Sequence, residues 1–314
     1  MTVDPHYHNR FGDYDPDVDS FASYNWKSKA TKEQWDNLID RMRNVSAAAE
    51  WQAVLDDEAP RTLALVNVSH SNMESWLTRA GKHGLVTRTL QYVEPYSGFA
   101  HGHTYTGRDN PERLCFTAVA ESEDVLDAAE DAYESDDAAT KHSRLGELLG
   151  FPDCCREHFL ENWLDEPSHD PMYEAACNTP SAERVAMTDE YDHVRVTDPS
   201  PWVNPMWRYF GLRFITHLPC SFECEASERV AYHRGRLMAD QDEAAAHALK
   251  SWLDAPFTWS GHNAIAHIRN EAVAAQVNSS PYLQEKRITW RGEHAAGGKV
   301  PGKGGAVDGT TVTQ

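Results

Sequence analysis

At 314 residues the chain is long enough for one large domain or two of ordinary size. Apolar residues make up 40% of it and ten residues are Trp, so a hydrophobic core is expected and global disorder is excluded. The net charge of −20 argues against binding to nucleic acid or anionic membranes. Because the acidic residues are spread along the whole chain, the charge favours adaptation to high salt.

The sequence carries no signal for a membrane or for secretion. No apolar run approaches the roughly 20 residues that cross a bilayer, and residues 1–19 lack the apolar segment of a signal peptide. We therefore expect a cytoplasmic protein with no membrane partner. Thiols stay reduced in that compartment, and clustered cysteines there more often bind metal or do chemistry than form disulfides.

The first half of the chain predicts an irregular arm, 1–30, followed by alternating strands and helices over 31–139. Apolar and β-branched runs predict strands at 62–68, 85–93 and 112–120. Helical periodicity and capping residues predict helices at 31–51, 71–80 and 122–135. The last five elements, in the order β-α-β-β-α, are the core of a ferredoxin-like α+β sandwich without an obvious fourth strand.

From residue 140 the pattern changes to helices and turns, and we expect a mostly helical half over 140–292 that packs on the first half or is continuous with it. Helices are predicted at 141–149, 152–164 and 224–253. Less regular stretches are expected as follows: mostly irregular at 165–205, a helix and then a strand at 207–215, and a hairpin at 259–277. The Gly-rich tail, 293–314, is expected to be disordered.

Four of the six cysteines fall in two short motifs, and each motif predicts a turn that opens a helix. The first motif reads Gly-Phe-Pro-Asp-Cys-Cys-Arg-Glu-His over 150–158, and the second reads His-Leu-Pro-Cys-Ser-Phe-Glu-Cys over 217–224. Pro152 suits the first turn of a helix, where free backbone N–H groups favour a thiolate. If the segment from Cys220 is helical, Cys220 and Cys224 share one face.

These motifs predict a thiolate-rich metal site, with the ligands Cys154, Cys155, Cys220 and Cys224 and with His217 as the first substitute. Zinc takes four cysteines, or three with one histidine, and a [4Fe–4S] cluster prefers four cysteines, or three with an open iron. Neither C-C nor C-x3-C is the usual C-x2-C zinc spacing. Inert buried thiols, and a disulfide or redox pair, therefore stay open as alternatives.

Three further histidines are candidates for the same site. His158 lies four residues after Cys154 on the same helical face, and His101 and His103 lie in a Gly- and Pro-containing loop between two predicted strands. The remaining cysteines, Cys115 and Cys177, are expected to be core or incidental residues and not ligands.

Other chemistry has weaker support. A cysteine nucleophile assisted by His217 or His158 would need fewer than four clustered cysteines. No phosphate-binding loop and no Gly-rich dinucleotide fingerprint is present. Arg208 and Arg213 could bind an anionic substrate, although arginines on a helix face are usually solvated.

The segments 145–159 and 204–227, which carry the two cysteine motifs, resemble an uncharacterised prokaryotic family, the domain of unknown function numbered 483. The resemblance covers about residues 110–280 and depends on the C-C and H-x-P-C-S-x-x-C motifs. It implies that both motifs belong to one module, and it carries no activity over.

Three hypotheses for the function follow. The first is a cytoplasmic metalloprotein with a zinc or iron–sulfur site, acting as an enzyme on a small molecule or peptide. The second is a non-catalytic module in which zinc holds the helices together and a protein partner binds the surface. The third is metal-free thiol redox or cysteine-nucleophile chemistry.

Overall fold

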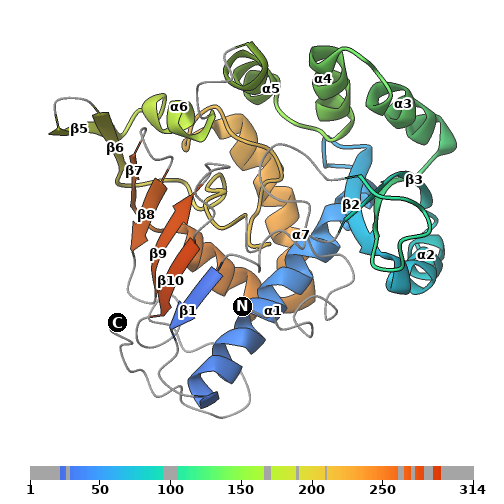
Figure 1. Cartoon of the computed structure of the whole chain (residues 1–314), viewed down its shortest axis with the longest axis horizontal. Coiled ribbons are helices and arrows are strands. Elements are labelled where there is room, and N and C mark those ends of the chain that lie inside the picture. Colours follow the sequence, from blue (N-terminus) through green and yellow to red (C-terminus); the bar gives the residue numbers. More distant parts are fainter. Residues whose placement is uncertain are drawn as a thin grey trace.

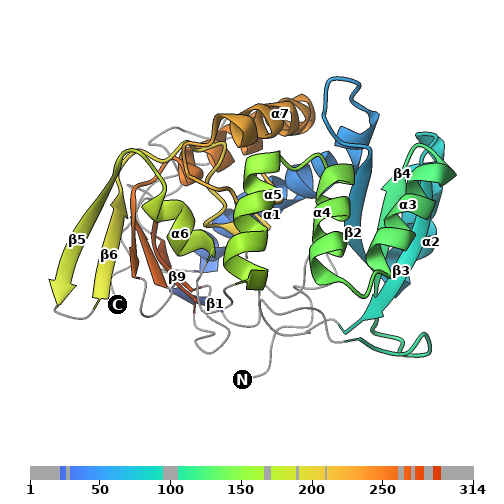
Figure 2. The ribbon, with the colours of Figure 1, turned by 90° about the horizontal axis from the view of Figure 1, so that it is seen from above.

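The computed structural model describes residues 22–25, 29–94, 105–165, 171–188, 191–208, 211–260, 265–269, 273–278 and 286–290. These residues form a mixed α/β protein with two separate sheets (Figure 1). Helices α6, α5, α4 and α3 follow one another across the molecule from the larger sheet to the smaller one (Figure 2). The predicted arm and tail lie partly or wholly outside the described residues.

The smaller sheet has the strand order β2-β4-β3, with β4 antiparallel to both neighbours. Its strands and the helices between and after them are β2 (Leu63–Ser69), α2 (Met73–Lys82), β3 (Val86–Val93), β4 (Leu114–Ala120) and α3 (Glu123–Tyr133). This is the element order that the sequence predicts. A ferredoxin-like sheet adds a fourth strand, which none of the described residues supplies, so the ferredoxin-like topology is not established.

Side chains alternate between the two faces along each strand, and helices cover both faces of the smaller sheet. On one face, Val66 and Val68 pack with Trp76 and Ala80 of α2. On the other face, apolar side chains of α3 and α4 (Ala138–Leu148) pack on Leu63. The sheet therefore has a core on each side.

The long helix α1 (Lys29–Gln52) lies beside α7 (Glu225–Leu253) and belongs to the core of the cysteine-bearing half (Figure 1). Arg41 on α1 donates two hydrogen bonds of 2.7 Å to the carboxylate of Asp242 on α7. Asp242 has non-helical backbone angles (φ −153°, ψ 89°), and its side chain accepts a hydrogen bond from the amide of Ala245. The kink in α7 is thus fixed by a local cap and by an ion pair to α1.

The larger sheet has the strand order β1-β10-β9-β8-β7-β6-β5, with antiparallel pairs except for the parallel pair of β1 and β10. Its strands are β1 (Ala22–Asn25), β5 (Ala182–Thr188), β6 (Tyr191–Val196), β7 (Phe257–Ser260), β8 (Ile265–Arg269), β9 (Val273–Asn278) and β10 (Lys286–Trp290). The predicted hairpin at 259–277 becomes the central part of this sheet.

Several expectations about local structure are wrong. The arm at 1–30 contains β1, and the segment expected to be irregular at 165–205 contains helix α6 (Pro171–Cys177) and the paired strands β5 and β6. In β6, Val194 and Val196 are buried and Arg195 is exposed, so a two-residue period is present among many Asp and Pro residues.

The expectation for 207–215 is also wrong, since the described residues of this segment form turns and not a helix and a strand. Gly211 has φ +68°, a conformation that ends regular structure. Trp207, Phe214 and Ile215 are nevertheless buried. Apolar content there reflects burial of an irregular segment, which periodicity cannot distinguish from a short helix.

Candidate metal centre

A tight turn between α4 and α5 (Asp153–Phe159) positions the first cysteine motif. Gly150 has φ +68°, and a Cβ atom at this position would lie 2.4 Å from the carbonyl oxygen of Pro60. The chain then enters α5 through Pro152, whose carbonyl accepts a hydrogen bond of 3.0 Å from the amide of Cys155. Cys154 and Cys155 therefore lie in the first turn of α5, as the position of Pro152 predicts.

The second motif is a loop and not a helix, which corrects the expectation for Cys220 to Cys224. Helix α7 begins at Glu225, and Cys224 is its N-cap residue. The buried ring of Phe222 anchors the loop, and its amide donates a hydrogen bond of 3.0 Å to Thr179 Oγ1. The amide of Cys220 donates to Cys155 Sγ at 3.4 Å, which joins the two motifs.

The four cysteine sulfurs converge at this junction. Cys154 Sγ lies 3.9 Å from Cys155 Sγ and 3.7 Å from Cys224 Sγ, and the last two sulfurs are 3.7 Å apart. All four sulfurs, including that of Cys220, lie within 4.8 Å of one another. Cys155 and Cys224 are buried, Cys220 is half-buried and Cys154 is exposed. All six cysteines are free thiols, and Cys115 and Cys177 lie outside the cluster.

The cluster is electrostatically uneven. Hydrogen bonds from the thiols of Cys155 and Cys220 hold the pKa of Cys224 well below its usual range. The pKa of Cys155 is raised because its thiol is hydrogen-bonded to Cys220 and Cys224 and is buried. When the four cysteines hold no metal ion, negative charge is therefore concentrated on Cys224. This residue lies at the N-terminus of α7, where the helix dipole also favours an anion.

His217 lies next to the four sulfurs but is not one of the converging groups. Its Nε2 atom is 2.8 Å from Ser227 Oγ, and Ser227 Oγ is 3.1 Å from Cys155 Sγ. Burial lowers the pKa of His217 to about 3, so the ring is neutral. The sequence does not single out Ser227 for this site, and the one signal for it is its place three residues after Cys224, the N-cap of α7.

His158, another candidate for the site, is not part of the cluster. His158 Nε2 lies 3.0 Å from the carbonyl oxygen of Pro171, and its Nδ1 lies 3.1 Å from the side-chain amide of Asn162. Both ring nitrogens are therefore engaged, Nε2 by the start of α6 and Nδ1 by the helical turn that continues α5. His101 and His103 lie outside the described residues.

A cavity of about 170 Å³ adjoins the cluster on the side of Cys155. It is lined by His142, Phe151, Cys155, Arg156, Phe159, Leu160, Thr216, His217 and Leu218. Two of these lining residues carry a buried side-chain nitrogen that has no hydrogen-bond partner among the described residues, His217 Nδ1 and Arg156 Nε. The lining is mostly apolar, and its polar residues include His142, Arg156, Thr216 and His217.

No family model, curated protein or solved structure matches the chain in comparisons with known proteins. The resemblance to the family of unknown function therefore stays a prediction. Among the described helices, none is both long and apolar enough to cross a membrane.

Proposed function

We propose that the chain is a zinc protein in which Cys154, Cys155, Cys220 and Cys224 hold a single ion. The spacing of the sulfurs carries this proposal. Four sulfurs at 2.3 Å from one zinc ion, at the corners of a tetrahedron, are about 3.8 Å apart. The three pairs formed by Cys154, Cys155 and Cys224 are 3.7, 3.7 and 3.9 Å apart, and Cys220 Sγ lies within 4.8 Å of each.

The same spacing favours one ion over an iron–sulfur cluster. In a [4Fe–4S] cluster each cysteine binds a different iron, so the four sulfurs surround the whole cluster and lie farther apart. A tetrahedral set of four thiolates is typical of zinc. The hydrogen bond between Ser227 and Cys155 Sγ supports a ligand from outside the first coordination shell, as is usual at zinc sites.

We infer a structural role for this ion. Four protein ligands close the coordination shell, whereas a catalytic zinc keeps one position open. The ligands come from the start of α5 and from the loop that leads into α7, and they lie 65 to 70 residues apart in the chain. Binding of the ion therefore contributes directly to the free energy of folding. The thiols must stay reduced, which suits a cytoplasmic location.

The cavity beside Cys155 supports a second candidate function, the binding of a small molecule. An apolar cavity with a few convergent polar atoms is the usual form of a ligand site. The polar lining residues Arg156, Thr216 and His217 would offer hydrogen bonds to such a molecule. The zinc ion would then hold the wall of the cavity in place, and a partner or substrate would bind next to it.

Metal analysis of protein purified without oxygen and without a metal-affinity tag tests the first proposal. We expect about one zinc per chain and no acid-labile sulfide. Cys154→Ser should lose the zinc and lower the denaturation midpoint, although Cys154 is exposed and its replacement leaves no cavity. Cys177→Ser, outside the cluster, is the matched control and should keep the zinc.

Two results would contradict this proposal. Iron with labile sulfide would identify a cluster, and four titratable thiols without metal would favour redox or nucleophilic chemistry. For the second candidate, Leu218→Trp should fill the cavity and keep the zinc. Mass spectrometry should then detect a co-purified small molecule with the native chain and not with this variant.

A further inference from the structure

Two pairs of rings line the cavity beside Cys155. The ring centroids of Phe151 and His217 lie 5.0 Å apart with the planes inclined by 41°, and those of His142 and Phe159 lie 5.2 Å apart with an inclination of 59°. Rings in such tilted arrangements attract one another beyond the burial of their apolar area. A flat ring inside the cavity can make the same kind of contact with these side chains.

The volume of the cavity is that of a molecule with one ring. It measures about 170 Å³, and an apolar cavity of about 150 Å³ holds one benzene molecule. The space is therefore enough for a six-membered ring with a small substituent. Leu160 and Leu218 complete the apolar part of the lining, so burial of the ring also removes apolar area from water.

The lining offers no uncompensated charge to a ligand. The guanidinium of Arg156 donates to the carbonyl oxygen of Ser143 at 3.0 Å and to the carboxylate of Asp153 at 2.5 Å. Burial and the neighbouring charge of Lys141 lower the pKa of His142, so its ring is neutral at pH 7. A charged ligand would lose its hydration without gaining a counter-charge. The cavity therefore favours a neutral molecule.

Two lining side chains have hydrogen-bonding groups to spare. The hydroxyl of Thr216 and the ring nitrogens of His142 have no hydrogen-bond partner among the described residues. Thr216 is half-buried between two buried residues, Ile215 and His217, and His142 is exposed on α4. A ligand with one polar substituent can hydrogen-bond to either group while its ring lies among the apolar side chains.

We propose that this cavity binds a neutral molecule with a single aromatic ring and one hydrogen-bonding substituent, of which phenol is the simplest. The inference rests on the second candidate function, the binding of a small molecule. The rings and leucines of the lining hold the aromatic ring, and Thr216 or His142 binds the polar substituent. No step of this recognition needs a free charge on the protein.

Isothermal titration of the full chain tests the ligand class. We expect saturable binding of phenol. Toluene has the same ring without a hydroxyl, and cyclohexanol has the hydroxyl without an aromatic ring; each should bind about 3- to 10-fold more weakly. Benzoate and benzylamine carry a negative and a positive charge on the same ring, and both should bind more weakly than phenol.

Variants test the residues. Thr216→Val removes the hydroxyl and keeps the shape, and His142→Phe removes the ring nitrogens. At least one of them should weaken phenol binding by about 3- to 10-fold and leave toluene binding unchanged. Thr78→Val, an exposed change on α2, is the control and should change neither. Leu218→Trp should abolish the binding of both molecules.

Four outcomes would overturn the inference. These are no saturable binding of phenol, affinities for cyclohexanol or toluene equal to that for phenol, tighter binding of benzoate or benzylamine, and unchanged phenol binding by both Thr216→Val and His142→Phe. If a charged or non-aromatic molecule co-purifies with the chain and phenol does not bind, the second candidate function stands and this inference fails. The zinc content of each sample tests the zinc proposal separately, because phenol binding by a zinc-free chain would overturn only that proposal.

Discussion

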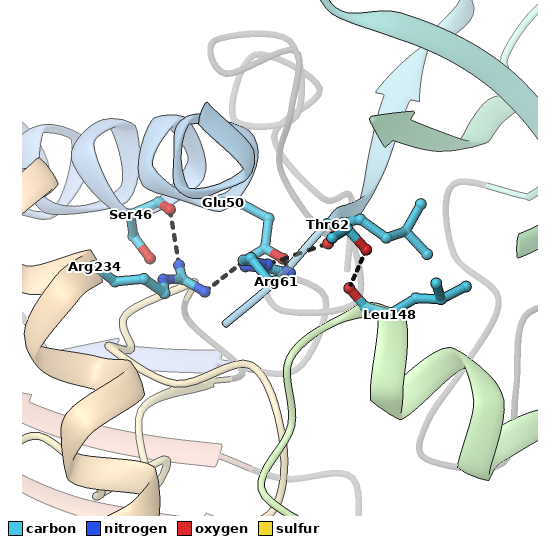
Figure 3. A network of polar contacts seen from close by, with 7 residues as sticks. Ser46, Glu50, Arg61, Thr62, Leu148 and Arg234 are labelled. Carbon is cyan, nitrogen blue, oxygen red and sulfur yellow. Dashed lines mark hydrogen bonds and ion pairs between the residues drawn. The ribbon is translucent and has the colours of Figure 1, made fainter. Parts of the chain in front are cut away.

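The buried group formed by Glu50, Arg61 and Arg234 allows a quantitative prediction. Replacing Glu50 with Gln keeps the shape of the side chain but removes the carboxylate that faces both guanidinium groups (Figure 3). Two buried cations would then lack a counter-charge. Removing one partner of a buried ion pair usually destabilises a protein by about 3–5 kcal/mol.

The pKa of Glu50 gives a second route to the magnitude. Burial by itself raises this pKa, but the positive charges of Arg61 and Arg234 outweigh it and hold the pKa at about 2, below the ordinary value of 4.5. A difference of this size between the folded and unfolded chain corresponds to about 3 kcal/mol of stability at neutral pH. Both routes lead to the same expected loss for Glu50→Gln.

Urea unfolding of the wild type and the variant from pH 7 to pH 3 tests this reasoning. Because the folded pKa is depressed, the contribution of Glu50 is complete above pH 4.5 and falls as the pH drops toward 2. The gap between wild type and Glu50→Gln should therefore be constant near neutrality and shrink in acid. Glu58→Gln, at an exposed pair with Arg236, is the control and should cost less than about 1 kcal/mol. A loss below about 1 kcal/mol for Glu50→Gln, or a gap independent of pH, would refute the reasoning.

Three further predictions follow from other parts of the structure. Ser227→Ala removes the hydrogen bond to Cys155 Sγ, so zinc should stay bound but with about 10-fold lower affinity in competition with a chelator; unchanged affinity would contradict a supporting role. Gly150→Ala should destabilise the chain by more than about 1 kcal/mol in urea, because φ is +68° and the new Cβ would meet the Pro60 carbonyl, whereas Gly81→Ala in open space should cost nothing. The net charge of −20 predicts that Tm rises with KCl up to molar concentration, and a Tm that falls with salt would contradict salt adaptation.

Much of the local structure could be predicted because it depends on neighbours in the sequence. The alternation of strands and helices from β2 to α3 follows from runs of apolar residues, and the structure contains it in that order, although the side-chain caps expected from Ser71 and Ser122 do not form. Strands β5 and β6 were missed because their apolar alternation is short and lies among Asp and Pro residues. Such strands are stabilised by their pairing in the larger sheet and not by their own composition.

The cysteine site, too, is determined partly by neighbouring residues and partly by tertiary packing. Pro152 and the turn at Gly150 determine locally that Cys154 and Cys155 begin a helix, and the residue types alone indicate a metal ligand set. Only tertiary packing decides that Cys220 and Cys224 reach them from a loop, and that His217 contacts Ser227 and not the sulfurs. Buried side chains such as Phe222 fix the position of the loop and so bring together residues that lie far apart in the chain. The periodicity of a helix or strand carries no information about such long-range contacts.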